Sequence, residues 1–481
     1  MRLDVRRTKI VCTIGPATQS EDMMRQIAVA GMNVARLNFS HGTKAEHAER
    51  INTIRRVESQ TGKPIAILQD LPGPKIRTGI IQETVHLVQG QSFSFTIREV
   101  CGSVDEVNLP FPEMVHQAEP GGQIFVADGQ LEFCIEDVTA TDIITRVVIG
   151  GQMGSHKGVN MPGARFSLPS VTDADIEDLE FGLAHDVDWV AASFVRCADD
   201  LKPVRDVIRQ SCKDVRLIAK IEKSEAVEDI DAIIEAADGI MVARGDLGVE
   251  MPLEAMPSIQ KMIIKKCNDA GKPVITATQM LESMLNNRRP TRAEVTDVAN
   301  AIFDGTDAVM LSGETAVGEY PVDTVSMMSK IAMEAESSLD YHKIWEERSA
   351  AAIPTVTEAI AQSTVDIASD LHAAAIVTPT SSGATARAVS KYRPSSLIVA
   401  ASTMPATYRQ LALSWGVFTV LVAPSRNTDD MIQEAVEGVL RAGLVNEGDT
   451  IVLTAGVPAG VPGRTNLIKV HTVGQTVGSQ L

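Results

Sequence analysis

The sequence predicts an α/β protein with a (β/α)₈ TIM barrel, a β-barrel-like lid domain inserted after the third strand, and a C-terminal open α/β domain. Eight apolar runs of small and β-branched residues each end in charged or hydroxyl residues before a helical pattern resumes. Such continuous apolar runs are typical of parallel strands buried on both faces. Two changes of pattern divide the chain into barrel segments 1–71 and 170–340, a lid 72–169 and a C-terminal domain 341–481.

Composition and charge narrow the class of protein. At 481 residues and 44% hydrophobic, the chain can bury more than one core, and aromatic residues at only 4% make those cores aliphatic, which suits parallel α/β packing. The formal net charge of −18 argues against nucleic acid or an anionic membrane as the main partner. Six cysteines without a CxxC pair, no signal-peptide pattern and no apolar run of membrane-spanning length lead us to expect a cytoplasmic protein.

The barrel is predicted from the positions of the eight apolar runs. They open segments 8–16, 34–42, 64–77, 188–196, 216–226, 239–250, 273–283 and 308–316. Stretches 20–32 and 43–62 supply the first two helices, with Ser20 as N-cap and Gly62 as the C-terminal stop.

The insert between residues 72 and 169 loses helical periodicity. Short alternating segments, separated by glycine-rich turns, predict strands within 84–89, 92–97, 123–129, 131–138 and 143–151. An insertion after the carboxyl end of a barrel strand stands over the catalytic face, so we expect it to act as a lid. Pro72, Gly73 and Pro74 fit either a hinge or a stiff exit from the strand.

Polar residues just past the strand ends predict one reactive mouth, because TIM barrels place their chemistry there. These residues are Asn38, Ser40, Asp70, Lys220, Glu222, Asp246, Thr278 and Glu314. Carboxylates, a lysine and hydroxyls together are what phosphoryl transfer with a divalent metal requires.

Two carboxylates are the candidate metal ligands. Glu222 and Asp246 close successive strands, so they can share one Mg²⁺ or Mn²⁺ and leave coordination sites for substrate oxygens; the alternative is that both only pair with lysines. Lys220 lies two residues before Glu222 and points to the same side of the strand. We expect its ammonium to neutralise a phosphoryl group, with a Schiff-base lysine as the rival role.

Other mouth residues have less specific patterns. Thr278 can donate a proton to a substrate carbon, or its hydroxyl can bond its own backbone. Arg36 is a candidate phosphate clamp, and Asn38, Ser40 and Asp70 can offer oxygens to a cation.

The C-terminal domain carries a second candidate anion site. In TPTSSGATARAVSKYRP an apolar strand runs into a polar loop that opens a helix, and its residues Thr380, Ser381, Ser382, Gly383 and Thr385 suit a phosphate. An ordinary capped helix start has a similar sequence.

Longer motifs carry a resemblance to a known family. They are TKIVCTIGPAT, VARLNFSHG, GPKIRTG, GSHKGVNMPG, AKIEKSEAV, MVARGDLGVE, TATQMLESM and RPTRAEVTDVANAIFDGTDAVMLSGETAVGEYP. With these motifs in order, and with its insert and terminal domain, the chain resembles pyruvate kinases of the bacterial, potassium-independent type. The resemblance implies phosphoryl transfer from phosphoenolpyruvate to ADP, giving pyruvate and ATP in the last step of glycolysis.

The resemblance also implies roles for individual residues. Lys220 is the phosphoryl-transfer lysine, Arg36 contacts the phosphoryl group, Glu222 and Asp246 hold the metal, and Thr278 belongs to the proton relay. Substrate binding falls to Ala243, Arg244, Gly245, Asp246 and Thr278, and nucleotide binding to Asn38, His41, Arg77 and Lys157. Members of the family are usually homotetramers, and the loop from Thr380 to Thr385 binds the phosphate of an allosteric effector.

One departure concerns the monovalent-cation region, which comprises Asn38, Ser40, Asp70, Leu71 and Lys75. Potassium-dependent members carry glutamate where this chain has Lys75 and threonine where it has Leu71. A lysine ammonium can supply the positive charge itself, so we expect activity without potassium. The alternative is that Lys75 is merely solvated at the hinge and potassium still binds.

Two other functions remain open from the residues. A metal-dependent lyase or aldolase acting on pyruvate enolates also carries paired carboxylates, but it does not explain the lid or the basic residues on the nucleotide side. A catalytically silent sensor of phosphorylated metabolites is the other alternative, and the intact set of Lys220, Glu222, Asp246 and Thr278 weighs against it.

Overall fold

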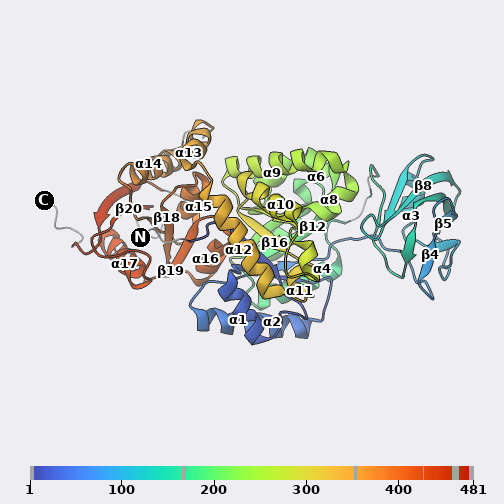
Figure 1. Ribbon diagram of the computed structural model, residues 1–481, viewed down its shortest axis with the longest axis horizontal. Coiled ribbons are helices and arrows are strands. Elements are labelled where there is room, and N and C mark those ends of the chain that lie inside the picture. The colour runs from blue at the N-terminus through green and yellow to red at the C-terminus, as the bar shows by residue number, and fades with distance from the viewer. Residues whose placement is uncertain are drawn as a thin grey trace.

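The computed structural model describes residues 5–164, 166, 169–351, 355–425, 427–457 and 465–475. Three parts follow one another along its longest axis, with the lid at one end, the barrel in the middle and the C-terminal domain at the other end (Figure 1). The outermost domain limits that we predicted, residues 1 and 481, lie outside the described residues. Among the described helices, none is long and apolar enough to cross a bilayer.

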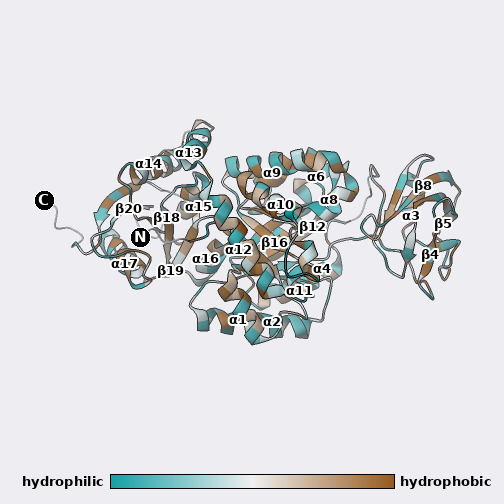
Figure 2. Ribbon diagram, viewed as in Figure 1, coloured by the Kyte–Doolittle hydropathy of each residue, from teal (hydrophilic) through white to brown (hydrophobic). Residues whose placement is uncertain are grey.

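The central part is a closed barrel of eight parallel strands, which confirms the prediction. Hydrogen-bonded neighbours follow the order β1-β16-β15-β14-β13-β12-β3-β2. The strands are β1 (Lys9–Thr13), β2 (Val34–Asn38), β3 (Ala66–Asp70), β12 (Trp189–Val195), β13 (Arg216–Ile221), β14 (Gly239–Ala243), β15 (Val274–Ala277) and β16 (Ala308–Leu311). Almost all of their residues are buried, and hydrophobic colouring predominates around β16 (Figure 2), which explains the continuous apolar pattern.

Helices surround the barrel, and the sequence signals for their ends are confirmed where we predicted them. Ser20 caps the first helix by accepting a hydrogen bond from Met23 N, and Gly62 ends the second in the left-handed conformation at φ 65°. The barrel helices are α1 (Glu21–Ala30), α2 (Lys44–Thr61), α4 (Asp173–Ala184), α5 (Lys202–Gln210), α6 (Ser224–Glu228), α7 (Ile230–Ala236), α8 (Arg244–Glu250), α9 (Met256–Ala270), α10 (Arg292–Phe303), α11 (Gly313–Ala316) and α12 (Pro321–Ser337). Short 3₁₀ helices cover Ala198–Leu201, Leu253–Ala255 and Glu282–Leu285.

The lid contains a six-stranded mixed sheet in the order β11-β7-β8-β9-β5-β6 and a two-stranded ribbon of β10 and β4. Its strands are β4 (Val85–Leu87), β5 (Ser92–Thr96), β6 (Glu106–Asn108), β7 (Gln123–Val126), β8 (Leu131–Val138), β9 (Asp142–Ile149), β10 (Gly151–Met153) and β11 (Val159–Asn160). Phe93, Phe95 and Phe133 contact one another in its core. The insert is β-rich, as predicted, and it also contains the short helix α3 (Pro112–Gln117), which has too few residues to show a helical period in the sequence.

One buried carboxylate, that of Asp175, binds both segments that connect the barrel to the lid. Asp175 Oδ1 accepts a hydrogen bond from Gly73 N at 3.0 Å, where the chain enters the lid. Asp175 Oδ2 accepts from Thr172 N at 2.8 Å and from Thr172 Oγ1 at 2.6 Å, where the chain returns. Gly73 has φ +69°, and a Cβ there would lie 2.9 Å from the Ser193 side chain, so this entry requires glycine.

The C-terminal domain is an open five-stranded sheet in the order β19-β18-β17-β20-β21, with β21 alone antiparallel among these strands. Its strands are β17 (Ala375–Pro379), β18 (Leu397–Ser402), β19 (Val417–Leu421), β20 (Thr450–Ala455) and β21 (Leu467–Thr472). Its helices are α14 (Val356–Asp370), α15 (Ala384–Lys391), α16 (Pro405–Gln410) and α17 (Thr428–Arg441), with a 3₁₀ turn at Leu411–Leu413, and α13 (Tyr341–Ala350) precedes them.

This domain packs on the amino-terminal ends of the barrel strands, opposite the mouth. Lys9 Nζ, at the start of β1, donates to Val417 O at 2.7 Å. Trp189 Nε1, at the start of β12, donates to Gln410 O at 3.3 Å. The lid and the C-terminal domain are therefore attached to opposite faces of one barrel (Figure 1).

Candidate active site

Lys220 lies at the centre of a buried polar cluster at the carboxyl ends of the strands. Its Nζ is 2.9 Å from Glu222 Oε1, 3.2 Å from Asp70 Oδ1 and 2.7 Å from Ser193 Oγ, to which it donates. Burial lowers the pKa of Lys220, but the Asp70 and Glu222 carboxylates outweigh it and hold the pKa above its ordinary value. The amine is therefore charged, which favours the electrostatic role over a Schiff base.

Asp70 connects this cluster to Arg36. Arg36 Nε donates to Asp70 Oδ2 at 2.6 Å and Nη1 donates to Thr13 Oγ1 at 2.9 Å. Burial raises the pKa of Asp70, but Lys220 and Arg36 outweigh it and lower the pKa below its ordinary value. Asp70 is thus ionised and already shared between two cations.

The predicted metal carboxylates lie at the ends of the neighbouring strands β13 and β14. Burial raises the pKa of Glu222, Lys220 opposes this, and the negative charge of Asp246 raises it further. Phe194 N donates to Glu222 Oε2 at 2.7 Å, and Lys75 Nζ donates to Asp246 Oδ1 at 3.2 Å. Each carboxylate pairs with a lysine, as the alternative interpretation expected.

The donor set nevertheless fits a divalent cation, because the repulsion between Glu222 and Asp246 is what such an ion relieves. No group of three or more His, Cys, Asp and Glu residues suited to a metal occurs in the described part of the chain. Two protein carboxylates leave the other coordination positions to water and substrate oxygens.

Thr278 has a strained backbone at φ +69°, unusual for a β-branched residue. Its Oγ1 donates to Ala277 O at 2.7 Å and accepts from Gly245 N at 2.8 Å, so the hydroxyl is bonded to backbone in this structure. Arg244 Nη2 donates to Thr278 O at 2.7 Å, and Arg244 Nη1 pairs with Asp297 at 2.8 Å. The Arg244 guanidinium and the Gly245 N–H are therefore both occupied within the protein.

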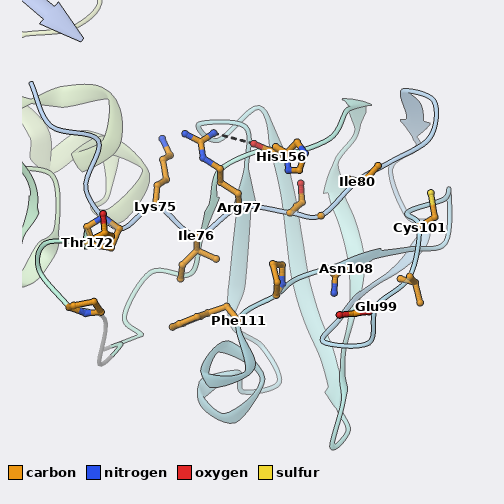
Figure 3. Close-up of a pocket in the computed structure, with 16 residues that line it drawn as sticks. Lys75, Ile76, Arg77, Ile80, Glu99, Cys101, Asn108, Phe111, His156 and Thr172 are labelled. Atoms are coloured by element: carbon orange, nitrogen blue, oxygen red, sulfur yellow. Dashed lines mark hydrogen bonds between the residues drawn. The ribbon is translucent and has the colours of Figure 1, made fainter. Parts of the chain in front are cut away.

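The predicted nucleotide residues fall on two sides. Asn38 ends β2 and His41 lies in the loop between β2 and α2, and Asn38 Oδ1 accepts from Ser40 N at 3.1 Å. Arg77 and Lys157 belong to paired segments of the lid, where Arg77 Nη1 donates to His156 O at 3.1 Å (Figure 3). Among the described residues, no hydrogen bond or ion pair joins Arg77 or Lys157 to the barrel loop.

A cavity of about 850 Å³ adjoins the segment by which the chain enters the lid. Lys75, Arg77 and His156 line it together with apolar residues such as Ile76 and Phe111 (Figure 3). Its volume lies in the range of sites that bind small molecules, so the basic side chains of the lid lie next to a space large enough for a ligand.

Lys75 bridges barrel and lid. Its Nζ is 3.2 Å from Asp246 Oδ1 and 3.2 Å from Asp128 Oδ1 of the lid. Burial lowers the pKa of Lys75, but Asp246 and Asp128 outweigh it and raise the pKa. Leu71 is buried in the barrel core and offers no side-chain oxygen to a cation.

Three placements were not expected from the sequence. Ser193 contacts Lys220 and Asp128 contacts Lys75. Neither residue belongs to a recognisable motif, since Ser193 lies inside an apolar run and Asp128 in a turn. Glu314 has a different role from the one expected. Its buried carboxylate accepts hydrogen bonds from Leu281 N at 3.1 Å and Ser312 N at 2.7 Å, so it holds the backbone that follows β15 and β16.

The predicted effector loop joins β17 to α15. Gly383 N-caps the helix at φ +77°, and its N donates to Thr380 Oγ1 at 2.9 Å. Ser381 is exposed and Ser382 is half-buried, whereas Thr385 is buried with its Oγ1 2.9 Å from Thr465 Oγ1. Among the described residues, no hydrogen bond involves the Ser381 or Ser382 hydroxyl, whereas the Thr385 hydroxyl is bonded and buried.

Comparisons with known proteins identify the family of this chain. The family model of the pyruvate kinase barrel domain matches residues 5–325, and that of the pyruvate kinase alpha/beta domain matches residues 358–471. The chain is 49% identical over 472 residues to a pyruvate kinase of Geobacillus stearothermophilus, covering 97% of this chain and 80% of the relative. It is 45% identical over 472 residues to a pyruvate kinase of Clostridium acetobutylicum, covering 98% of this chain and 100% of the relative.

A solved structure shows the same fold. A pyruvate kinase from Cryptosporidium parvum superposes with a TM-score of 0.92 at 37% identity, covering 97% of this chain and 96% of that one. The chain belongs to the pyruvate kinase family of phosphotransferases.

Proposed function

We propose that this chain transfers the phosphoryl group of phosphoenolpyruvate to ADP. The observation that carries the proposal is the charged Lys220, held between Asp70 and Glu222 at the barrel mouth beside Asp246. In the reaction a β-phosphate oxygen of ADP forms a bond to phosphorus, the bond from phosphorus to the enol oxygen breaks, and the enolate gains a proton at its methylene carbon.

The residues divide this reaction between them. Lys220 and Arg36 neutralise the phosphoryl oxygens, and the backbone from Ala243 to Asp246 receives the substrate carboxylate. Glu222 and Asp246 hold Mg²⁺ or Mn²⁺, which supplies positive charge to the phosphoryl group when bound. Thr278 delivers the proton, for which its hydroxyl must exchange its bond to Ala277 O for one to substrate or water.

The nucleotide site combines Asn38 and His41 of the barrel with Arg77 and Lys157 of the lid. Because these pairs lie on separate parts, a nucleotide that contacts both draws the lid toward the mouth. Lys75 stays next to Asp246 and takes the place of a potassium ion, so potassium is not required.

Regulation and assembly complete the proposal. The loop with Thr380, Ser381, Ser382, Gly383 and Thr385 binds the phosphate of a phosphorylated metabolite that activates the enzyme. The enzyme works as a homotetramer, as proposed from the family resemblance.

Replacement of a metal ligand tests the proposal. Asp246→Asn removes one charged oxygen ligand and should reduce turnover by at least about a hundredfold and raise the Mg²⁺ concentration needed. Thermal unfolding should change little, because a residue at the barrel mouth serves function more than packing. Turnover with unchanged Mg²⁺ dependence in a folded Asp246→Asn variant would overturn the metal assignment.

A further inference from the structure

A small basic cavity lies where the C-terminal domain packs on the barrel, at the face opposite the mouth. Its volume is about 20 Å³. The loops before β15 and β16 line it from the barrel side, and α15 with the residues after it lines it from the C-terminal domain. Its functional groups belong to Lys272, Asp307, Arg387, Lys391, Arg393 and Ser414.

Positive charge exceeds negative charge in this lining, which has four cationic side chains and one carboxylate. Arg393 Nη2 is 3.2 Å from Asp307 Oδ1, and Lys391 Nζ pairs with Glu358 at 3.1 Å. Among the described residues, Lys272 Nζ donates to backbone carbonyls alone, at the end of α7.

Arg387 makes no ion pair with any described residue; its Nη2 donates to Ser382 O at 3.1 Å. Burial, aided by the charge of Arg216, lowers the pKa of Arg387 to about 10, and burial also lowers the pKa of Arg393. Arg387 is half-buried and has no carboxylate partner among the described residues, so the lining keeps an excess of positive charge after Arg393 has paired with Asp307 and Lys391 with Glu358.

Unpartnered hydrogen-bond donors point to the missing group. Arg393 Nε, Arg393 Nη1 and Ser414 Oγ have no hydrogen-bond partner among the described residues. Arg393 is 4% exposed and Ser414 is 3% exposed, so bulk solvent does not satisfy them. Buried polar groups in proteins are nearly always bonded, and an arginine offers donors only. The occupant must therefore be an acceptor.

We propose that this cavity binds a small inorganic anion of chloride size, held by Arg393, Ser414 and Arg387. A single water needs roughly 10–15 Å³ of such space, so the cavity admits one monatomic ion and excludes a tetrahedral oxyanion. The excess positive charge selects an anion over a neutral water. Its occupancy ties the C-terminal domain to the barrel. Arg387 of α15, Arg393 just after this helix and Ser414 before β19 belong to the C-terminal domain, while Asp307 and Lys272 belong to the barrel.

This size preference separates the cavity from the sites of the proposed function. The mouth and the effector loop suit phosphate groups, whereas the cavity suits halides. The inference does not depend on the proposed activity.

Bromide, which scatters anomalously, tests occupancy directly in crystals of the full chain. We expect an anomalous peak in the cavity within contact distance of Arg393 and Ser414, and no sulfate there in crystals soaked in sodium sulfate. Ordered water without bromide at this position would overturn the proposal.

Melting temperatures in solution distinguish a specific anion site from an ion that binds only adventitiously. The melting temperature is followed as chloride replaces methanesulfonate at constant ionic strength, which removes general screening. Ser414→Ala and Arg387→Met should each raise the chloride midpoint by about two- to tenfold, the range expected for one lost hydrogen bond. Ser414→Ala removes only a hydroxyl and keeps the test available if Arg387→Met fails to fold.

Arg441→Met is the matched control, because Arg441 is an exposed arginine of the same domain. It should reproduce the parent curve. Identical chloride curves for the parent and Ser414→Ala would show an adventitious ion only, and would overturn the proposal even if bromide enters the crystal.

Discussion

Lys75 lies where the chain leaves the barrel for the lid, and its ammonium contacts one carboxylate from each part. Asp246 of the barrel and Asp128 of the lid are both 3.2 Å away. Since these carboxylates outweigh burial and raise its pKa, the side chain stays charged at neutral pH. The alternative of a solvated lysine does not describe this geometry, because the side chain is 23% exposed and doubly paired.

Reversal of this charge should create a potassium requirement. Lys75→Glu places a third carboxylate near Asp246 and Glu222, so the variant should need a monovalent cation to relieve the repulsion. We expect its activity to rise at least about tenfold when potassium replaces a large organic cation, while the parent changes little. Lys75→Met serves as the control, since it removes the charge without adding a negative one. Strong potassium activation of the parent would contradict this role for Lys75.

At the scale of an element, helix α15 connects two sites. Its start carries the loop from Thr380 to Gly383, and Arg387 on the same helix lines the basic cavity while bonding Ser382 O. A phosphate bound at the loop would contact one end of this short helix, and the barrel contacts the same helix through the cavity. The helix can therefore couple effector binding at the loop to the barrel.

Removal of two hydroxyls tests the loop. Ser382→Ala with Thr385→Ala should raise the concentration of a phosphorylated activator needed for half-maximal effect by about tenfold or more, because each lost hydrogen bond to phosphate weakens binding. The maximal rate should be preserved, since the loop lies on the domain opposite the mouth. Thr465→Ala is a useful control, because it disturbs the buried partner of Thr385 without removing a loop hydroxyl. Superimposable activation curves across sugar phosphates and nucleotides would eliminate the site.

The sequence predicted the strands and helices whose buried residues recur at a regular spacing. It predicted less well the residues that meet only through contacts between distant parts of the chain. The barrel strands and the caps at Ser20 and Gly62 follow from local rules. Helix α3 has six residues, fewer than a helical period needs to stand out. Asp128 contacts Lys75 and Ser193 contacts Lys220 only through tertiary packing, and nothing in the residues next to them in the sequence indicates these contacts.

At the scale of the whole molecule, the contact between barrel and C-terminal domain buries a lysine. Lys9 is 3% exposed, donates to Val417 O and lies 4.7 Å from the centre of the Phe418 ring. Burial, reinforced by the charge of Arg6, lowers the pKa of Lys9 to about 7, against partial opposition from acidic neighbours. The interface thus contains a group that titrates near neutral pH only in the folded state.

The sign of its effect on stability follows from proton counts. An unfolded lysine has a pKa of about 10.4, so between pH 7 and 10.4 the unfolded chain binds more protons at this site than the folded chain. Stability should therefore rise with pH across that window, and the penalty is complete below pH 7. Lys9→Met should flatten the rise in melting temperature between pH 7 and 9 relative to the parent, whereas the exposed-site variant Lys265→Met should not. Parallel profiles for the parent and Lys9→Met would contradict the shifted pKa.

The proposed function makes the Lys220 cluster responsible for phosphoryl transfer, and a comparison of the parent with one variant tests this role. Pyruvate formation from phosphoenolpyruvate and ADP is measured with Mg²⁺ for the purified parent chain and for Lys220→Met. The melting temperature and the Mg²⁺ binding of the variant are also measured, because the substitution leaves two buried carboxylates without their cation. We expect rapid pyruvate formation by the parent, a loss of at least about a hundredfold in the variant, and continued metal-dependent exchange of pyruvate methyl protons with solvent in both. No pyruvate from the parent, or undiminished transfer by a folded Lys220→Met variant, would contradict it.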